Sequence, residues 1–236
     1  MVTTQEVHYN DGEQSLNGLL AWDSTRLDRR PGILVVHGGA GLDEHARSRA
    51  RRFAELGFLA CACDMYGEGV KGNRQRTLEY LNAVRNDPAL LVSRAQPALD
   101  ILSSHPLVNG RRAAVGYCFS GMVVLALARS GADLAGVVSV HGSLQTTRPA
   151  PPNAIKARIL VCHGGIDPHV PMTDVTAFVS EMNGAGADYQ LVIYGQAMHG
   201  FTHEIATGQT PGVAYHAPSD TRSWTAIQSF FDEIFA

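Results

Sequence analysis

Short uninterrupted runs of apolar residues recur along this chain, and stretches with helical character separate them. Strands that are covered by helices on both faces consist of such runs, because neither face of the strand meets water. The expected strands cover residues 32–36, 58–63, 112–115, 137–140, 159–162 and 189–194. The expected helices cover residues 44–56, 76–86, 88–104, 122–128, 173–183 and 221–235. This alternation predicts an α/β fold with a mostly parallel central sheet and helices on both faces.

The first part of the chain departs from this alternation. Residues 7–9 and 16–22 flank a turn-forming Asn-Asp-Gly sequence, which predicts an N-terminal β-hairpin. No Pro/Ser-rich linker divides the 236 residues, so we expect a single domain over residues 1–236. In a parallel sheet of this kind the site lies outside the carboxyl ends of the strands, so polar residues that follow the predicted strands are the first candidates for function.

The charge balance argues against a nucleic-acid partner. The chain has 19 Lys and Arg against 22 Asp and Glu, which gives a net charge of −3 with neutral His, and it has no basic stripe. Residues 1–14 are polar and lack the pattern of a signal peptide, and no apolar run approaches the length of a membrane span. Four cysteines in a chain of this size do not indicate a disulfide framework. We therefore expect a cytoplasmic protein that binds neither nucleic acid nor membrane.

The sequence Ala-Ala-Val-Gly-Tyr-Cys-Phe-Ser-Gly over residues 113–121 predicts a nucleophile elbow, in which a strand turns sharply into a helix. The turn holds the nucleophile in a strained backbone conformation, so the residues two positions before and after it are small. Gly116 and Ser120 meet this requirement around Cys118. The turn also places the thiol at a helix N-terminus, where the helix dipole favours a thiolate. The alternative is a buried structural cysteine between a strand and a helix.

Two further strand ends carry residues that complete a catalytic triad. Asp167 lies in a His-Gly-Gly-Ile-Asp-Pro sequence just after the predicted strand that ends at residue 162, and His199 follows the strand that ends at residue 194. Nucleophile, acid and then His is the chain order of α/β-hydrolases. In such a triad His199 takes the proton of Cys118, and Asp167 fixes the imidazole tautomer and stabilises its cation.

A glycine-rich loop supplies candidate donors for an oxyanion hole. The sequence His-Gly-Gly-Ala-Gly follows the first predicted strand of the alternation, and glycines permit close approach of the backbone to a ligand. We expect the N–H of Phe119 to act with the N–H of Gly39, or with that of Gly38. A phosphate-binding loop is the competing interpretation, but the Gly-x-Gly-x-x-Gly and Gly-Lys-Ser/Thr patterns are absent.

These motifs resemble the dienelactone hydrolase family, whose members have the α/β-hydrolase fold. The resemblance extends over nearly the whole chain, and residues 116–121 are its most specific part. Residues 64–67, 165–168 and 199–201 support it.

The resemblance implies a hydrolase of small-molecule esters or lactones that forms a covalent intermediate on a cysteine. Its triad on this sequence is Cys118, His199 and Asp167. It implies no metal and no organic cofactor. A secondary activity on activated phosphotriesters is also implied, since a thiolate can displace a good phenol leaving group from phosphorus.

Two positions depart from the family pattern. Gly38 stands where members commonly have a Glu that interacts with the thiol, so we expect Cys118 to pair directly with His199 and to be partly thiolate at rest. His203 stands where dienelactone-cleaving members have an Arg that binds the substrate carboxylate, and neutral His binds a carboxylate less well. Neutral esters and lactones are therefore the expected substrates. The residues expected to contact the substrate are His37, Tyr66, Tyr117, Phe201 and His203.

Three other interpretations have a basis in the sequence. His199 and His203 would share one face of a helix as metal ligands, but Gly200 and the loop character of the segment favour no metal site. Glutamine amidotransferases and DJ-1-like enzymes also present a cysteine on an elbow, but those amidotransferases carry a His-x-Glu signature, and here His203 and Glu204 are adjacent. The third is a non-catalytic ligand-binding protein with the hydrolase fold, which an assay of p-nitrophenyl ester turnover distinguishes from an enzyme.

Overall fold

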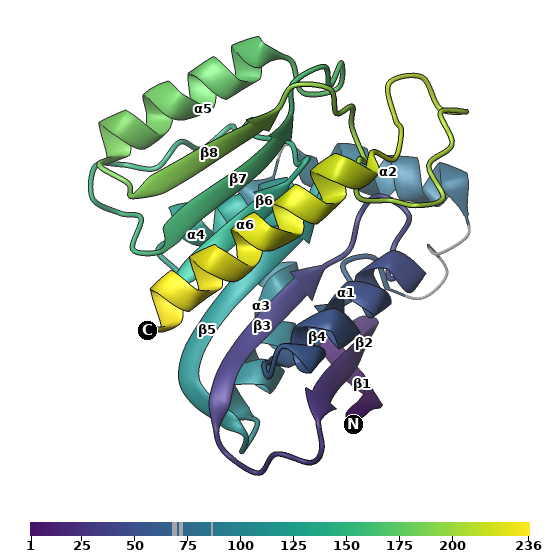
Figure 1. Cartoon of the computed structure of the whole chain (residues 1–236), viewed down its shortest axis with the longest axis vertical. Helices are drawn as coiled ribbons and strands as arrows, with labels where there is room; N and C mark the ends of the chain where they lie inside the picture. Colours follow the sequence, from purple (N-terminus) through teal and green to yellow (C-terminus); the bar gives the residue numbers. More distant parts are fainter. Residues whose placement is uncertain (68–69, 71–72, 86) are drawn as a thin grey trace. The chain divides into compact units, whose positions relative to one another are not determined.

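The computed structural model describes residues 1–67, 70, 73–85 and 87–236 (Figure 1). The chain consists of two compact units, residues 1–115 and residues 116–236. Strand β5 (Val108–Tyr117) crosses from the first unit into the second. The expectation of a single domain stays a prediction.

The first unit contains the hairpin that the sequence predicts. Strands β1 (Val2–Asp11) and β2 (Gln14–Asp23) pair in antiparallel register on either side of Gly12, which has a φ of 59°. Strand β2 is also antiparallel to β4 (Leu59–Cys63), and β4 is parallel to β3 (Arg30–Val36). The strand order in this unit is β1-β2-β4-β3-β5.

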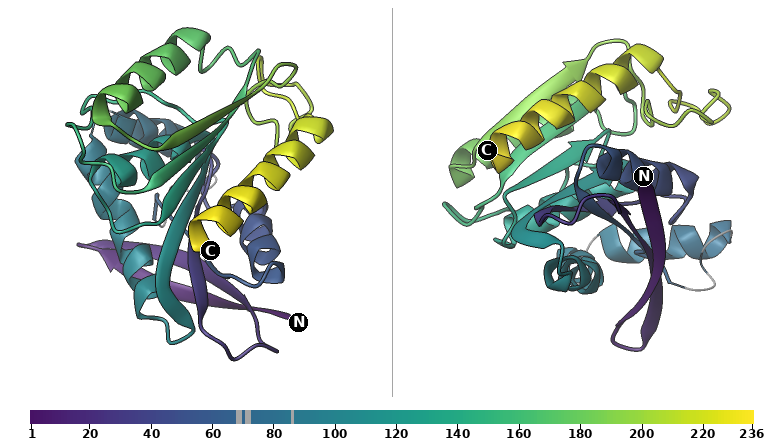
Figure 2. Two further views of the ribbon diagram at one scale, coloured as in Figure 1. Left: turned by 60° about the vertical axis from the view of Figure 1, so that its left-hand side comes forward. Right: turned by 60° about the horizontal axis from the view of Figure 1, so that its bottom comes forward.

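The helices of the first unit lie on both faces of its strands. Helix α1 (Glu44–Glu55) and helix α3 (Pro88–Ser104) pack on opposite faces of β3 and β4 (Figure 2). Both helices begin at an Asp whose carboxylate accepts backbone N–H groups of the first turn. Helix α2 (Arg74–Arg85) begins earlier than the predicted helix over residues 76–86, and Asn86 lies outside the described residues.

The second unit repeats the alternation of strand and helix. Its strands β6 (Gly136–Val140), β7 (Arg158–Gly164) and β8 (Tyr189–Tyr194) are parallel neighbours in that order. Helices α5 (Met172–Ala185) and α6 (Ala217–Phe235) lie on opposite faces of these strands (Figure 2). The mostly parallel α/β architecture with helices on both faces is thereby confirmed.

One strand is longer than the sequence predicts. The expected strand over residues 112–115 lies within β5, which begins at Val108 and ends at Tyr117. Residues 109–111 in the first half of β5 are exposed and read Asn-Gly-Arg, so they carry no apolar signal. The second half, residues 113–117, is fully buried and is the part that leads to the elbow.

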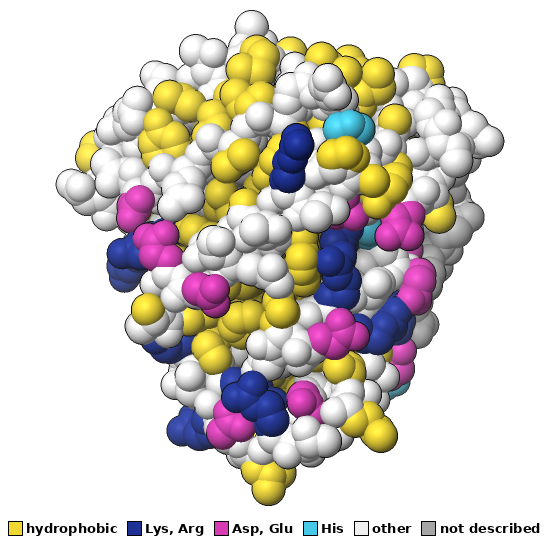
Figure 3. Space-filling view, in the orientation of Figure 1, with side chains coloured by type: hydrophobic (Ala, Val, Ile, Leu, Met, Phe, Trp, Pro, Cys, Tyr) yellow, Lys and Arg dark blue, Asp and Glu magenta, His cyan; other side chains and the backbone are white. Residues whose placement is uncertain are grey.

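Two further features of the molecule are the distribution of charged side chains on its surface and the length and apolar character of its helices. Basic and acidic side chains are interspersed on the face that Figure 3 draws. Among the described residues, no helix combines the length and the apolar character that a membrane crossing requires.

Candidate active site

Cys118 occupies a sharp turn between β5 and helix α4 (Gly121–Arg129). Its φ is 56°, a left-handed conformation that residues other than glycine seldom adopt. A Cβ added at Gly116 would lie 2.0 Å from the carbonyl oxygen of Ser120. A Cβ added at Gly121 would lie 2.5 Å from the Cα of Gly142. Both positions therefore need glycine, and at Gly116 the small residue has the steric cause that the sequence suggests.

The three residues of the predicted triad lie together in the second unit. His199 Nε2 is 3.0 Å from Cys118 Sγ, and His199 Nδ1 is 2.9 Å from Asp167 Oδ2. Asp167 follows β7, and His199 follows β8, so both residues come from loops at the carboxyl ends of neighbouring parallel strands. Asp167 and His199 are buried, whereas Cys118 is partly exposed.

Hydrogen bonds fix the charge of Asp167. Oδ1 accepts the backbone N–H groups of His169 at 2.8 Å and Val170 at 3.1 Å, while Oδ2 faces the ring of His199. Burial raises the pKa of Asp167, but the hydrogen bonds with His199 and with these backbone groups outweigh burial and hold the pKa below its usual value. Asp167 is therefore a carboxylate at neutral pH.

The carboxylate and the thiol together raise the proton affinity of His199. Burial alone would lower the pKa of His199, but hydrogen bonds with Asp167 and Cys118 outweigh it and raise the pKa to about 10. His199 thus tends to hold a second proton at neutral pH. A buried imidazolium between a carboxylate and a sulfur atom can exchange a proton with the thiol and can later donate it to a leaving group.

The sequence of this chain matches the model of the dienelactone hydrolase family over residues 16–235. The chain belongs to the dienelactone hydrolase family. It is a dienelactone hydrolase-like hydrolase with the α/β-hydrolase fold.

Solved structures and curated relatives agree with this membership. A dienelactone hydrolase-like promiscuous phosphotriesterase from metagenomic libraries is 38% identical, with a TM-score of 0.94 over 99% of this chain and 98% of that one. The structure named m3DLH is 37% identical, with a TM-score of 0.94 over 100% and 99% of the two chains. A Yersinia pestis protein assigned as a carboxymethylenebutenolidase is 24% identical over 86% of this chain and 78% of its own length.

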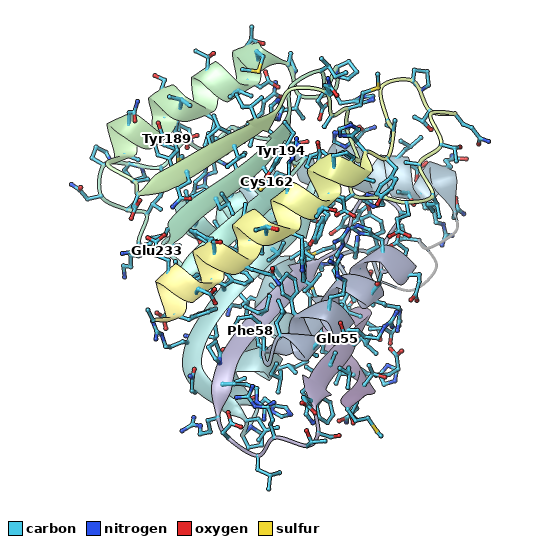
Figure 4. The ribbon with its side chains drawn as sticks, in the orientation of Figure 1. Glu55, Phe58, Cys162, Tyr189, Tyr194 and Glu233 are labelled. Carbon is cyan, nitrogen blue, oxygen red and sulfur yellow. The ribbon has the colours of Figure 1, made fainter. Side chains whose placement is uncertain are left out.

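The other three cysteines of this hydrolase differ from Cys118 in exposure. Cys61, Cys63 and Cys162 are completely buried. Burial raises the pKa of Cys61 and Cys162 to about 12 and holds the pKa of Cys63 well above its usual value. Cys162 and Tyr194 face one another from β7 and β8, with Sγ and the hydroxyl oxygen 3.7 Å apart (Figure 4). These thiols are packing residues, as their positions in predicted strands suggest.

The segment 208–216 is attached by its backbone to the loops of the acid and the base. The N–H of His199 donates to the carbonyl of Gly212 at 3.1 Å, and the N–H of Ala214 donates to the carbonyl of His199 at 3.1 Å. His169 Nε2 lies 3.0 Å from the carbonyl oxygen of Pro211 and donates to it. These bonds fix the backbone on both sides of His199. The sequence could not predict this arrangement, because no apolar pattern marks it.

Replacement of Gly212 with Ala is expected to disturb the triad. The φ of Gly212 is 76°, and an added Cβ would lie 2.2 Å from Pro168 Cγ. We expect a loss of stability of about 1–3 kcal/mol and a fall in kcat for ester hydrolysis, since Gly212 bonds to the backbone of His199. Thermal unfolding and steady-state kinetics measure both effects. Gly208→Ala is the matched control, because Gly208 has a φ of 83° but an added Cβ meets nothing within 4 Å. Equal behaviour of the two variants would contradict the packing argument.

In the first unit, the side chains of the predicted substrate residues His37 and Tyr66 form hydrogen bonds with backbone groups, including those of Gly38 and Gly39. His37 is completely buried; its Nδ1 donates to the carbonyl of Gly38 at 2.6 Å, and its Nε2 accepts the N–H of Met65 at 3.0 Å. The hydroxyl of Tyr66 donates to the carbonyl of Gly39 at 2.9 Å. These bonds favour a role of His37 and Tyr66 in holding the glycine loop. Their contact with substrate, and the donor roles of Gly38 and Gly39, stay predictions.

The predicted residues of the second unit surround the ring of His141. The ring centroids of Phe201 and His203 lie 5.1 and 5.5 Å from that of His141, and the Tyr117 ring lies at 6.1 Å. Phe201 and Tyr117 are buried, and His203 is half-buried. Phe119, the predicted oxyanion donor, is the residue after Cys118 in the turn before α4. The roles of these four residues toward substrate stay predictions.

The metal interpretation requires His199 and His203 to share one face of a helix, and the structure has no helix at these residues. His199 and His203 lie in a loop, where the N–H of His203 donates to the carbonyl of Gly200 at 2.9 Å. Within the described part of the chain, no group of three His, Cys, Asp or Glu residues is arranged to hold a metal ion.

Proposed function

We propose that this protein hydrolyses carboxylic esters and lactones without a cofactor, with Cys118 as nucleophile, His199 as acid and base, and Asp167 as the carboxylate that orients His199. The observation that carries the proposal is the chain of contacts from Sγ to Nε2 at 3.0 Å and from Nδ1 to Oδ2 at 2.9 Å. The four free cysteines fit a reducing compartment such as the cytoplasm.

The reaction follows from the charges of the three residues. The Cys118 thiolate attacks the carbonyl carbon, and the oxyanion that forms is stabilised by the N–H of Phe119 together with that of Gly39 or Gly38. Imidazolium His199 donates its proton to the leaving alcohol as the carbon–oxygen bond breaks, which leaves an acyl thioester on Cys118. Neutral His199 then takes a proton from water, which attacks the thioester and releases the acid and the Cys118 thiolate.

Neutral acyl compounds suit this site better than acidic lactones. His203 stands where dienelactone-cleaving relatives place an arginine, and a neutral imidazole does not offer the permanent bidentate fork of a guanidinium. Its ring packs 5.5 Å from that of His141, in a group of aromatic rings. The residues proposed to contact the acyl and alcohol groups are Tyr117, Phe201 and His203.

A second activity on activated phosphotriesters is supported by similarity and by chemistry. The metagenomic enzyme that is 38% identical over 99% of this chain is described as a promiscuous phosphotriesterase. The Cys118 thiolate can displace a phenolate from a neutral phosphotriester, which forms a phosphorus–sulfur bond and breaks a phosphorus–oxygen bond. Imidazolium His199 gives its proton to the departing phenolate, and neutral His199 then takes a proton from the water that attacks phosphorus and releases the Cys118 thiolate.

A substrate panel with mass spectrometry of the intact protein tests the proposal. The panel contains p-nitrophenyl acetate and butyrate, a neutral lactone, an acidic dienelactone and a dialkyl p-nitrophenyl phosphate. We expect a burst of nitrophenol, an acyl adduct on Cys118, and loss of both in Cys118→Ala. Turnover that persists in Cys118→Ala, or binding of substrate without release of product, would overturn it. A higher kcat/KM for the acidic dienelactone than for neutral substrates would contradict the proposed substrate class.

Alkylation by iodoacetamide at pH 7 is expected to modify Cys118 and to spare the three buried cysteines. Because the pKa of His199 is raised to about 10, its imidazolium persists from pH 7 to 9 and would stabilise the proposed thiolate of Cys118 over this range. The rate for the wild type should therefore be nearly flat over this range. In His199→Ala the rate should instead rise with pH toward the ordinary thiol pKa of ~8.5. A wild-type profile that follows the ordinary thiol would contradict a resting thiolate.

A further inference from the structure

We propose that His141 is a positioning residue that orients the backbone of the elbow, so that the N–H of Phe119 faces the reacting carbonyl. This inference rests on the proposed function of Cys118. His141 is the residue directly after β6, and it is completely buried. Its Nδ1 lies 3.1 Å from the backbone nitrogen of Cys118 and accepts that N–H.

The other ring nitrogen of His141 fixes the tautomer that this bond needs. Nε2 lies 2.8 Å from Oγ1 of Thr202. Since Nδ1 accepts the N–H of Cys118, the ring proton of neutral His141 is on Nε2 and is donated to Thr202. Thr202 belongs to the loop that carries His199. His141 therefore connects the peptide of the nucleophile to the loop of the base.

The backbone of His141 is itself held in an unusual conformation. Its φ is 40°, and the described residues include two other non-glycine residues with positive φ, Cys118 and Asn153. The N–H of His141 donates to the carbonyl of Cys162 at 2.8 Å, which attaches it to β7. A Cβ added at the next residue, Gly142, would lie 2.5 Å from the Cα of Gly121 at the start of α4. Backbone strain of this kind at a buried residue persists when surrounding structure over-determines it, and it is typical of functional sites.

The bond between His141 and Cys118 determines where the next peptide group points. The nucleophile must keep its left-handed φ for the following N–H to face the oxyanion. In the turn from Cys118 to Ser120, the bond to His141 restrains the peptide that precedes Cys118. Among the described residues, the titratable rings near His141 include those of His199 and His203, with centroids 5.5 Å away in each case, and that of Tyr117 at 6.1 Å.

Two substitutions of His141 separate its two hydrogen bonds. His141→Asn keeps an acceptor at the place of Nδ1, and Asn tolerates a positive φ. His141→Gln keeps a polar group near Thr202 and loses the acceptor. We expect kcat for p-nitrophenyl butyrate to fall ~10²-fold in His141→Gln with little change in KM, because small misplacement of a reacting group costs about that much. We expect His141→Asn to restore kcat to within about fivefold of the wild type.

Alkylation and two controls distinguish positioning from a general loss of structure. Iodoacetamide needs no oxyanion hole, so its rate with Cys118 at pH 7 should stay close to that of the wild type in His141→Gln. His141→Gly relieves the backbone and removes the acceptor, so it should lose kcat as His141→Gln does. His8→Gln, at an exposed position of β1, makes the same side-chain change and is expected to leave kcat unchanged.

Three results would overturn the proposal. They are full kcat in His141→Gln or His141→Gly, failure of His141→Asn to restore kcat, and parallel loss of alkylation and turnover. Failure of the proposed function would give a different result, because turnover would then persist in Cys118→Ala.

Discussion

Replacement of His199 with Ala is expected to lower kcat/KM for p-nitrophenyl butyrate by ~10⁴-fold or more, since loss of one member of a triad removes most of the rate that the unit provides. The reason lies in the two contacts of the imidazole, 3.0 Å to Cys118 Sγ and 2.9 Å to Asp167 Oδ2. Through these contacts His199 is the group placed to exchange a proton with the thiol, to protonate the leaving alcohol and to activate water, so its loss removes all three roles. Steady-state kinetics and the acyl adduct on Cys118 measure the loss.

Two further variants make this result specific. Asp167→Asn keeps the shape of the acid but removes its charge, and it should cost about 10⁴-fold through the wrong imidazole tautomer. His8→Ala, at an exposed position of β1, controls for the loss of an imidazole in general. Activity within tenfold of the wild type in His199→Ala would show that a different base acts. His169, whose ring centroid lies 5.3 Å from that of His199, is then the next candidate.

The parts of the fold that the sequence predicted are those with a local physical signature. Helix α3 and strand β8 have the predicted bounds. A Pro after a capping Asp marks the start of α3, and a short apolar run marks β8. The elbow was predictable for a steric reason, since the added Cβ at Gly116 or Gly121 would collide with backbone. The order of Cys118, Asp167 and His199 at strand ends was also readable, and these residues do lie in contact.

The parts that the sequence could not predict depend on bonds between distant segments. Backbone groups make these bonds, so they leave no pattern in residue types. They are the bond from the N–H of Cys118 to His141 and the bonds between His199 and residues 212–214. The positive φ of His141 is likewise unreadable from the sequence, because outside glycine such a conformation carries no signal in residue type. The first half of β5 could not be predicted either, because residues 109–111 are exposed and carry no apolar side chain.

Replacement of Gly116 with Ala is expected to have the largest effect on stability. The added Cβ would lie 2.0 Å from the carbonyl oxygen of Ser120 and 2.5 Å from its carbonyl carbon. Both atoms belong to the backbone, so no side chain can rotate to relieve the clash. We expect a loss of about 3 kcal/mol or more, because overpacking against fixed backbone is among the most destabilising changes. A chain of this length then loses roughly 6–12 °C in Tm.

The same clash should reduce catalysis in the molecules that remain folded. Ser120 can move away from Gly116 only if the turn that holds Cys118 opens, and this shifts Sγ and the N–H of Phe119 together. We expect kcat at a temperature well below Tm to fall ~10²-fold or more. Gly184→Ala is the matched control, because Gly184 lies inside α5 and an added Cβ meets nothing within 4 Å. That variant should gain about 0.5–1 kcal/mol from helix propensity. If Gly116→Ala matched Gly184→Ala in Tm and kcat, the elbow would not require glycine, and the steric explanation of the sequence around Cys118 would fail.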